Sequence, residues 1–178
     1  MNKHVPNIIS ILRIILSLVL LLVIDTKLIF FVLVFIIGIT DVADGAIARK
    51  YNLTSKTGAL LDSFADLVFF MIILIILFLR YDSVIMDNLF FFTSVVTVKI
   101  ITMLVSKIKH GEVVFIHTLA NKLTGLLVFI LIMMLPFELN KILIKAVLML
   151  SIYAALEEMI IIIRDKEINL NRKSIWRK

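Results

Sequence analysis

The stretch Gly58–Arg80 reads GALLDSFADLVFFMIILIILFLR and joins two aspartates to a long apolar run. After Asp66, no charged residue appears until Arg80. A helix needs about 20 mostly apolar residues to cross a bilayer, and the run lacks the alternation of a barrel strand. The stretch therefore predicts a membrane-spanning helix with carboxylates near one end.

The composition of the whole chain is typical of an integral membrane protein. Hydrophobic residues make up 62% of the 178 residues, charged residues make up 18%, and the mean hydropathy is +1.13. A soluble domain of this size cannot bury so much apolar surface, which excludes soluble, secreted and disordered classes. The chain has no cysteine, so disulfides, thiolate zinc sites and cysteine nucleophiles are excluded as well.

Five further apolar runs accompany the first one. Together they predict an all-α integral membrane fold, a bundle of six transmembrane helices that forms one domain over residues 1–178. The runs cover about Asn7–Ile24, Leu28 to the polar stretch Asp41–Lys50, Gly58–Arg80, Asn88–Val105, Phe115–Leu135 and Lys141–Ile163.

The net charge of +6 is distributed unevenly over the predicted loops. Since positive loop residues favour the cytoplasmic side, both termini and the loops after the second and fourth spans are expected there, in a cell membrane. The tail from Arg164 is interpreted as a solvated positive segment, in preference to a docking site for anionic lipid. No nucleic-acid partner is implied. The positive residues on this side are Lys3, Arg49, Lys50, Lys56, Lys107, Lys109 and those of the tail, against Lys27, Arg80 and Lys141 opposite.

Four aspartates lie near the predicted cytoplasmic ends of the second and third spans. Asp41 and Asp44 are three residues apart and Asp62 and Asp66 are four apart, so each pair shares one side of its helix. A hairpin through Tyr51–Thr57 brings all four together, and cations must then offset their repulsion. Hard oxygen ligands favour Mg²⁺ or Mn²⁺, and two such ions are typical of phosphoryl transfer. We expect a polar cavity that opens to the cytoplasm.

Small residues and one arginine accompany these aspartates. Gly45 and Ala48 follow Asp44 on one helix, and Gly58 precedes Asp62 by one turn on the other. They leave room for a nucleotide beside the backbone, although helix packing explains glycines in membrane helices equally well. Arg49 offers a planar fork for phosphate oxygens.

The two halves of this polar region together resemble the signature of the CDP-alcohol phosphotransferase family. DVADGAIAR at 41–49, eight further residues and GALLDSFAD at 58–66 match D-x2-D-G-x2-A-R-x8-G-x3-D-x3-D at every fixed position. In the first span, NIISILR at 7–13 resembles the N-x2-T-x2-R pattern of bacterial phosphatidylglycerophosphate synthases, with Ser10 in place of threonine.

The resemblance implies a membrane enzyme of phospholipid synthesis. A hydroxyl of a small polar alcohol attacks the β-phosphorus of CDP-diacylglycerol, and CMP leaves. The four aspartates are implied as ligands of two Mg²⁺ or Mn²⁺ ions, with Asp66 also acting as the general base. A homodimer is implied too. The residues implied around the CDP group are Asn7, Ser10, Gly45, Ala48, Arg49 and Gly58.

Two sequence patterns favour different acceptor alcohols. Basic residues near the predicted cytoplasmic ends favour glycerol 3-phosphate, because a phosphorylated acceptor needs additional positive charge beside a diphosphate. The stretch Asp62–Asp66, with Ser63 as its second residue, instead resembles the D-S-x-A-D pattern of phosphatidylserine synthases, whose acceptor is L-serine. Gly111 is expected to be a flexible point in the loop. The acceptor-binding candidates are Arg13, Lys107, Lys109, His117 and Lys122.

Two other classes of protein remain as alternatives. Intramembrane aspartates also mark divalent-cation transporters, and a lipid-binding scaffold needs no catalysis. The crowding of the aspartates at one end disfavours a transport path, and the intact set of four disfavours a non-catalytic scaffold.

Glu157 and Glu158 in the last span need partners at membrane depth. Lys99, Lys122 and Lys145 are the candidate cations, and a structural ion pair is preferred over a catalytic role. Because adjacent helical residues point about 100° apart, the two glutamates cannot both face one neighbour.

Overall fold

The computed structural model describes the backbone of residues 5–50, 56–116, 118–137, 139–165, 172 and 174–176. Side chains are described in these ranges except at 5–6, 44–50, 56 and 59. The described residues are almost entirely helical, as the sequence predicts. The helices are α1 (Val5–Val19), α2 (Lys27–Lys50), α3 (Lys56–Arg80), α4 (Asp82–Asp87), α5 (Leu89–His110), α6 (Leu119–Met133) and α7 (Lys141–Arg164).

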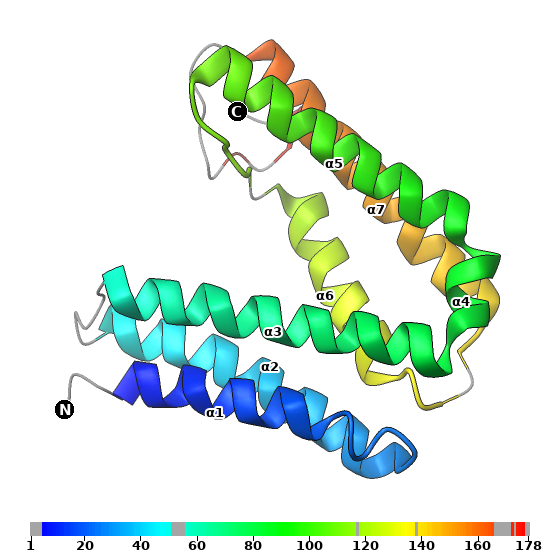
Figure 1. The fold of residues 1–178 in the computed structure, drawn as a ribbon. Helices are drawn as coiled ribbons and strands as arrows, with labels where there is room; N and C mark the ends of the chain where they lie inside the picture. The colour runs from blue at the N-terminus through cyan, green and yellow to red at the C-terminus, as the bar shows by residue number, and fades with distance from the viewer. Residues whose placement is uncertain are drawn as a thin grey trace. The chain divides into compact units, whose positions relative to one another are not determined.

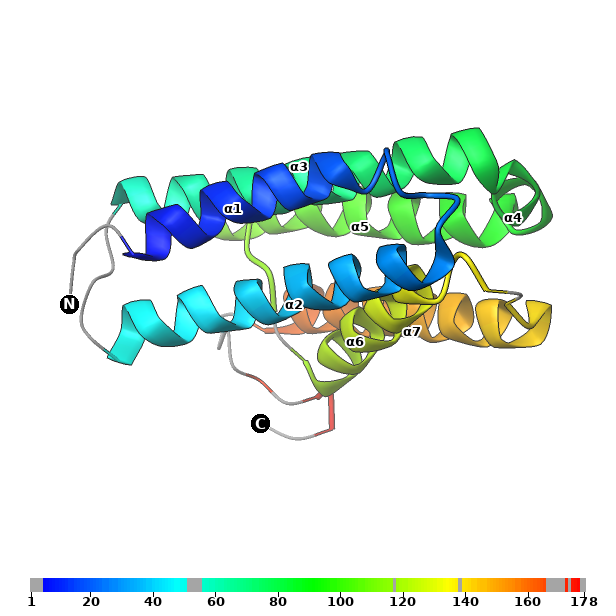
Figure 2. The same ribbon diagram turned by 90° about the horizontal axis from the view of Figure 1, so that it is seen from below.

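The chain divides into two compact units. Unit 1 comprises Met1–Asp82 and Ile132–Glu138, and unit 2 comprises Ser83–Leu131 and Leu139–Lys178. In unit 1, α1 lies alongside both α2 and α3 (Figure 1 and Figure 2). In unit 2, α5 packs along α7.

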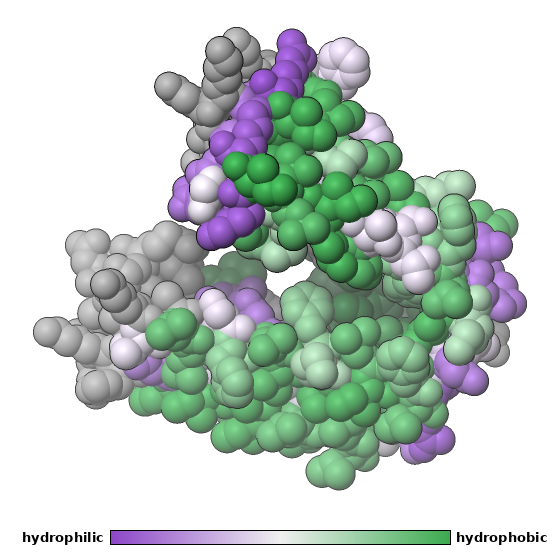
Figure 3. All heavy atoms as spheres, turned by 45° about the horizontal axis from the view of Figure 1, so that its top comes forward, coloured by the Kyte–Doolittle hydropathy of each residue, from purple (hydrophilic) through white to green (hydrophobic). Residues whose placement is uncertain are grey.

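On the face shown in Figure 3, apolar side chains cover much of the surface of the described residues, and hydrophilic ones form smaller patches. Phe90 is 75% exposed on α5, and Phe78 is 62% exposed on α3. Soluble proteins rarely expose so many large apolar side chains, whereas lipid tails accept them. The surface is therefore that of a membrane protein.

Three helical stretches are long and apolar enough to cross a membrane. They are Leu60–Arg80, Leu89–His110 and Lys141–Arg164, and Asn7–Val19 and Leu119–Met133 are shorter apolar helices. These helices confirm that the chain has the character of a membrane protein. The bundle of six spans and the single domain stay predictions.

Most helix boundaries agree with the apolar runs, and the exceptions have local causes. The first run extends to Ile24, but α1 ends at Val19 and the chain continues in hydrogen-bonded turns. The fifth run begins at Phe115, but α6 begins at Leu119 because the preceding residues are tied elsewhere. The short α4 was not predicted.

The segment from Glu112 to Ile116 is held by side chains from two helices. The buried Ser106 hydroxyl of α5 donates to the carbonyl of Glu112 (2.9 Å) and accepts from the amide of Val114 (3.0 Å). The Glu158 carboxylate of α7 accepts from the amide of Ile116 (2.9 Å). These bonds satisfy backbone groups of a non-helical segment, and α6 begins after it, later than its apolar pattern suggests.

Glu158 is also half of an ion pair in which the carboxylate is buried and the Lys99 side chain is 37% exposed. It is 1% exposed, pairs with the Lys99 ammonium of α5, and accepts from the Asn121 amide (3.1 Å). The prediction of a structural ion pair is confirmed, with Lys99 as the partner. Glu157 points elsewhere, since it accepts from the amide of Ile175 (3.0 Å).

The described part of the C-terminal tail packs against α7. The buried Arg172 side chain pairs with Asp165 and donates to the carbonyls of Ser174 and Ile175, both at 3.1 Å. Ile175 packs against the apolar cluster that contains Ile161. The interpretation of the tail as a solvated segment is therefore wrong at Arg172, because Asp165, the residue that directly follows α7, gives this arginine a partner.

We predict that Lys99→Met lowers the free energy of unfolding by about 3 kcal/mol, because it leaves the buried Glu158 charge without its cation. Adding Glu158→Gln should recover part of this loss, since glutamine still accepts from Ile116 without a charge. Thermal unfolding in detergent, with the exposed Lys145→Met as control, measures both effects. If the double variant loses the sum of the unfolding free energies that the two single variants lose, the coupling between Lys99 and Glu158 is contradicted.

Candidate active site

The aspartates continue the buried stripes of their helices. On α2, Phe30, Val34 and Ile37 are buried, and Asp41 follows at the next helical repeat. On α3, Asp62 precedes the buried Ala65 by three residues. The same helical periodicity that packs apolar side chains against α1 thus delivers carboxylates at one end of these stripes.

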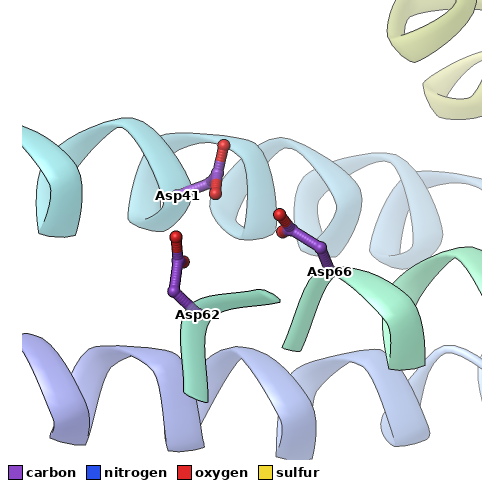
Figure 4. Close-up of side chains that lie close together, drawn as sticks. All are labelled: Asp41, Asp62 and Asp66. Carbon is purple, nitrogen blue, oxygen red and sulfur yellow. The ribbon is translucent and has the colours of Figure 1, made fainter. Parts of the chain in front are cut away.

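Three carboxylates converge at this point of unit 1. Asp41 extends from α2, and Asp62 and Asp66 extend from α3 (Figure 4). One carboxylate oxygen from each lies within 4.8 Å of the others. All three side chains are about half exposed, so the cluster is open to small ions on one side.

A buried arginine contacts all three carboxylates. Arg13 of α1 is 1% exposed, and its Nη1 contacts Asp41 Oδ1 at 2.5 Å. Its Nη2 pairs with the Asp62 carboxylate, donates to the Asp62 carbonyl (3.0 Å) and lies 3.2 Å from Asp66 Oδ1. The carbonyl of Arg13 accepts from the Ser17 hydroxyl at 2.8 Å. One guanidinium therefore links all three helices of unit 1.

The charges of this group suit a divalent cation. One guanidinium against three carboxylates leaves a net charge of −2 on the described side chains. Hard carboxylate oxygens this close together are the donor set that Mg²⁺ and Mn²⁺ prefer. The described residues therefore fit a divalent metal ion.

The remaining predicted residues of the catalytic region lie on the same helices. Asn7 and the buried Ser10 belong to α1, and Gly58 belongs to the first turn of α3. The backbone of α2 includes the other four, but their side chains lie outside the described residues. These four are Asp44, Gly45, Ala48 and Arg49.

Most acceptor-binding candidates belong to unit 2, unlike Arg13. Lys107 and Lys122 are exposed on α5 and α6, and His117 lies outside the described residues. Lys109 instead donates to the carbonyls of Ile163 (2.6 Å) and Asp165 (2.7 Å) at the end of α7. A cation in this position caps unpaired carbonyls and complements the helix dipole.

Gly111 is the C-cap of α5, and its expected role as a flexible point stays a prediction. Its φ is 79°, and its amide donates to the carbonyl of Lys107 (3.1 Å). This left-handed conformation ends α5 and favours glycine for steric reasons.

The contact of Arg13 with the aspartates was not predicted from the sequence. The available signal was the charge itself, because an arginine in the middle of an apolar run needs a partner of opposite charge. Asp41 and Asp62 lie 28 and 49 residues away along the chain, so no local pattern identified them as that partner.

Comparison with known proteins identifies the family. The model of the CDP-alcohol phosphatidyltransferase family matches residues 3–157, most of the chain. No curated protein matches the sequence. The chain belongs to the CDP-alcohol phosphatidyltransferase family and is a phosphotransferase, which favours the enzyme over the transporter and scaffold alternatives.

We predict different effects on stability for two neighbouring lysines. Lys109→Met should lower the free energy of unfolding by about 1 kcal/mol because the end of α7 loses its cap, whereas the exposed Lys107→Met should change it little. Thermal unfolding of both variants in detergent measures the difference. Equal midpoints would mean that Lys109 does not stabilise α7.

Proposed function

We propose that this enzyme transfers the phosphatidyl group of CDP-diacylglycerol to glycerol 3-phosphate and releases CMP. The observation that carries the site is the convergence of Asp41, Asp62 and Asp66 in a chain of this family. In the reaction, the acceptor oxygen forms a bond to the β-phosphorus while the bond from that phosphorus to the CMP oxygen breaks.

Asp66 is proposed as the general base. It takes the proton of the acceptor hydroxyl as the new bond forms, and its half-exposed carboxylate is accessible to a small substrate. Asp41, Asp62, Asp66 and, from the sequence, Asp44 are proposed as the ligands of two Mg²⁺ or Mn²⁺ ions. When bound, such ions neutralise the diphosphate and stabilise the leaving CMP.

The CDP group is proposed to lie against small residues of α2 and α3. The motif places Gly45, Ala48 and Gly58 where a larger side chain would obstruct the nucleotide, and Arg49 offers paired donors to phosphate. Asn7 and Ser10 of α1 complete the proposed CDP site.

The acceptor proposal rests on charge. Glycerol 3-phosphate adds about two negative charges next to a diphosphate, so cations beyond the metal ions must attract it. Lys107 and Lys122 are exposed and remain the candidates for this role. Lys109 has carbonyl partners, and His117 stays a prediction from sequence.

The location of the reaction is also part of the proposal. The positive residues of the predicted cytoplasmic loops favour a site on the cytoplasmic side of the cell membrane, where CDP-linked precursors and polar alcohols meet. A homodimer is proposed from family resemblance alone.

We predict that Asp62→Asn lowers the rate of CMP release by at least about 10²-fold, since it removes one charge from the metal ligands. Asp25→Asn is the matched control, because Asp25 forms an exposed pair with Arg80 in the same unit. CMP release from CDP-diacylglycerol by purified protein in Mg²⁺ measures both. A wild-type rate for Asp62→Asn would refute the site.

We predict that glycerol 3-phosphate supports CMP release and that L-serine, inositol phosphate and glycerol do not. Lys107→Gln should then raise the KM for glycerol 3-phosphate about fivefold, equivalent to about 1 kcal/mol, with little change for CDP-diacylglycerol. Lys145→Gln is the control. Formation of phosphatidylserine from L-serine would instead favour the alternative that Ser63 suggests.

A further inference from the structure

Among the described side chains of unit 1, Arg13 and Arg80 both pair with aspartates, but in different surroundings. Arg80 is 53% exposed and contacts the 74% exposed Asp25, so water screens the pair. Arg13 is 1% exposed and contacts three carboxylates at once. A buried guanidinium without carboxylates would be costly, so the cluster and Arg13 depend on each other.

Arg13 and the three carboxylates that it contacts differ in their exposure to solvent. The Arg13 side chain is buried, whereas Asp41, Asp62 and Asp66 are about half exposed. A cation from solvent therefore reaches carboxylates that already share their charge with Arg13. Two cations on one group of carboxylates repel each other, and the repulsion is strong where water is excluded.

We infer that Arg13 is an internal counter-ion that holds the carboxylate cluster together without metal and weakens its affinity for divalent cations. This inference rests on the proposed metal site. Its consequence is that the ions stay exchangeable and the fold of unit 1 does not depend on them. Arg13 is thus a positioning residue of the aspartates, in addition to any contact with the acceptor.

The electrostatic argument predicts opposite effects on stability and on metal binding. Without the guanidinium, the net charge of the described group becomes −3, so the metal-free protein loses stability through carboxylate repulsion. The same change strengthens attraction for a divalent ion. A residue that merely shaped the ligand geometry would lower both stability and metal affinity when removed.

Titration with Mn²⁺, followed by the loss of the free-ion EPR signal, tests the inference on full-length protein in detergent. We expect Arg13→Gln to lower the Kd for Mn²⁺ at least about tenfold and to lower the Tm in EDTA. Arg13→Lys keeps the charge and should bind Mn²⁺ within about threefold of wild type. Arg80→Gln is the matched control, and it should change neither the Kd for Mn²⁺ nor the Tm in EDTA.

Weaker Mn²⁺ binding by Arg13→Gln would overturn the inference, as would unchanged binding. If Arg13→Gln folds only with Mn²⁺, the inference is supported, because the ion then replaces the arginine. If saturating Mn²⁺ cannot restore its fold, the two cations are not interchangeable and the inference fails. Absence of Mn²⁺ binding by wild type would instead refute the proposed metal site itself.

Discussion

The ion pairs of Arg13 are the interaction on which unit 1 depends. A guanidinium that is 1% exposed in an apolar helix requires carboxylates from both neighbouring helices, and the carboxylates require a cation between them. The contacts of α1 with α2 and α3 therefore serve folding and chemistry together. The helices that bury apolar stripes also bring together three carboxylates, with one oxygen of each within 4.8 Å of the others.

Unit 2 satisfies a buried charge in a comparable way. Glu158 lies within the buried stripe of α7, and it obtains a lysine, an amide side chain and a backbone amide as partners. Its side chain is 1% exposed. Glu158 therefore stabilises the fold, whereas the half-exposed aspartates of unit 1 remain accessible to ligands.

The sequence was most informative where the pattern was local. Helical periodicity predicted α3 and α7 almost to their ends, and the spacing of Asp62 and Asp66 predicted a shared side of one helix. Contacts between distant segments could not be predicted in the same way. Lys109 looks like a substrate-binding residue in sequence, but its partners are carbonyls more than 50 residues away. The roles of Asp44 and His117 stay predictions.

The most direct measurement of the central claim is the position of bound Mn²⁺ in a crystal of the protein, located by anomalous scattering. The account predicts an ion bounded by Asp41, Asp62 and Asp66, on the side of the carboxylates that faces away from the Arg13 guanidinium. An ion bound elsewhere in the chain, with these three aspartates free of metal at saturating Mn²⁺, would contradict it.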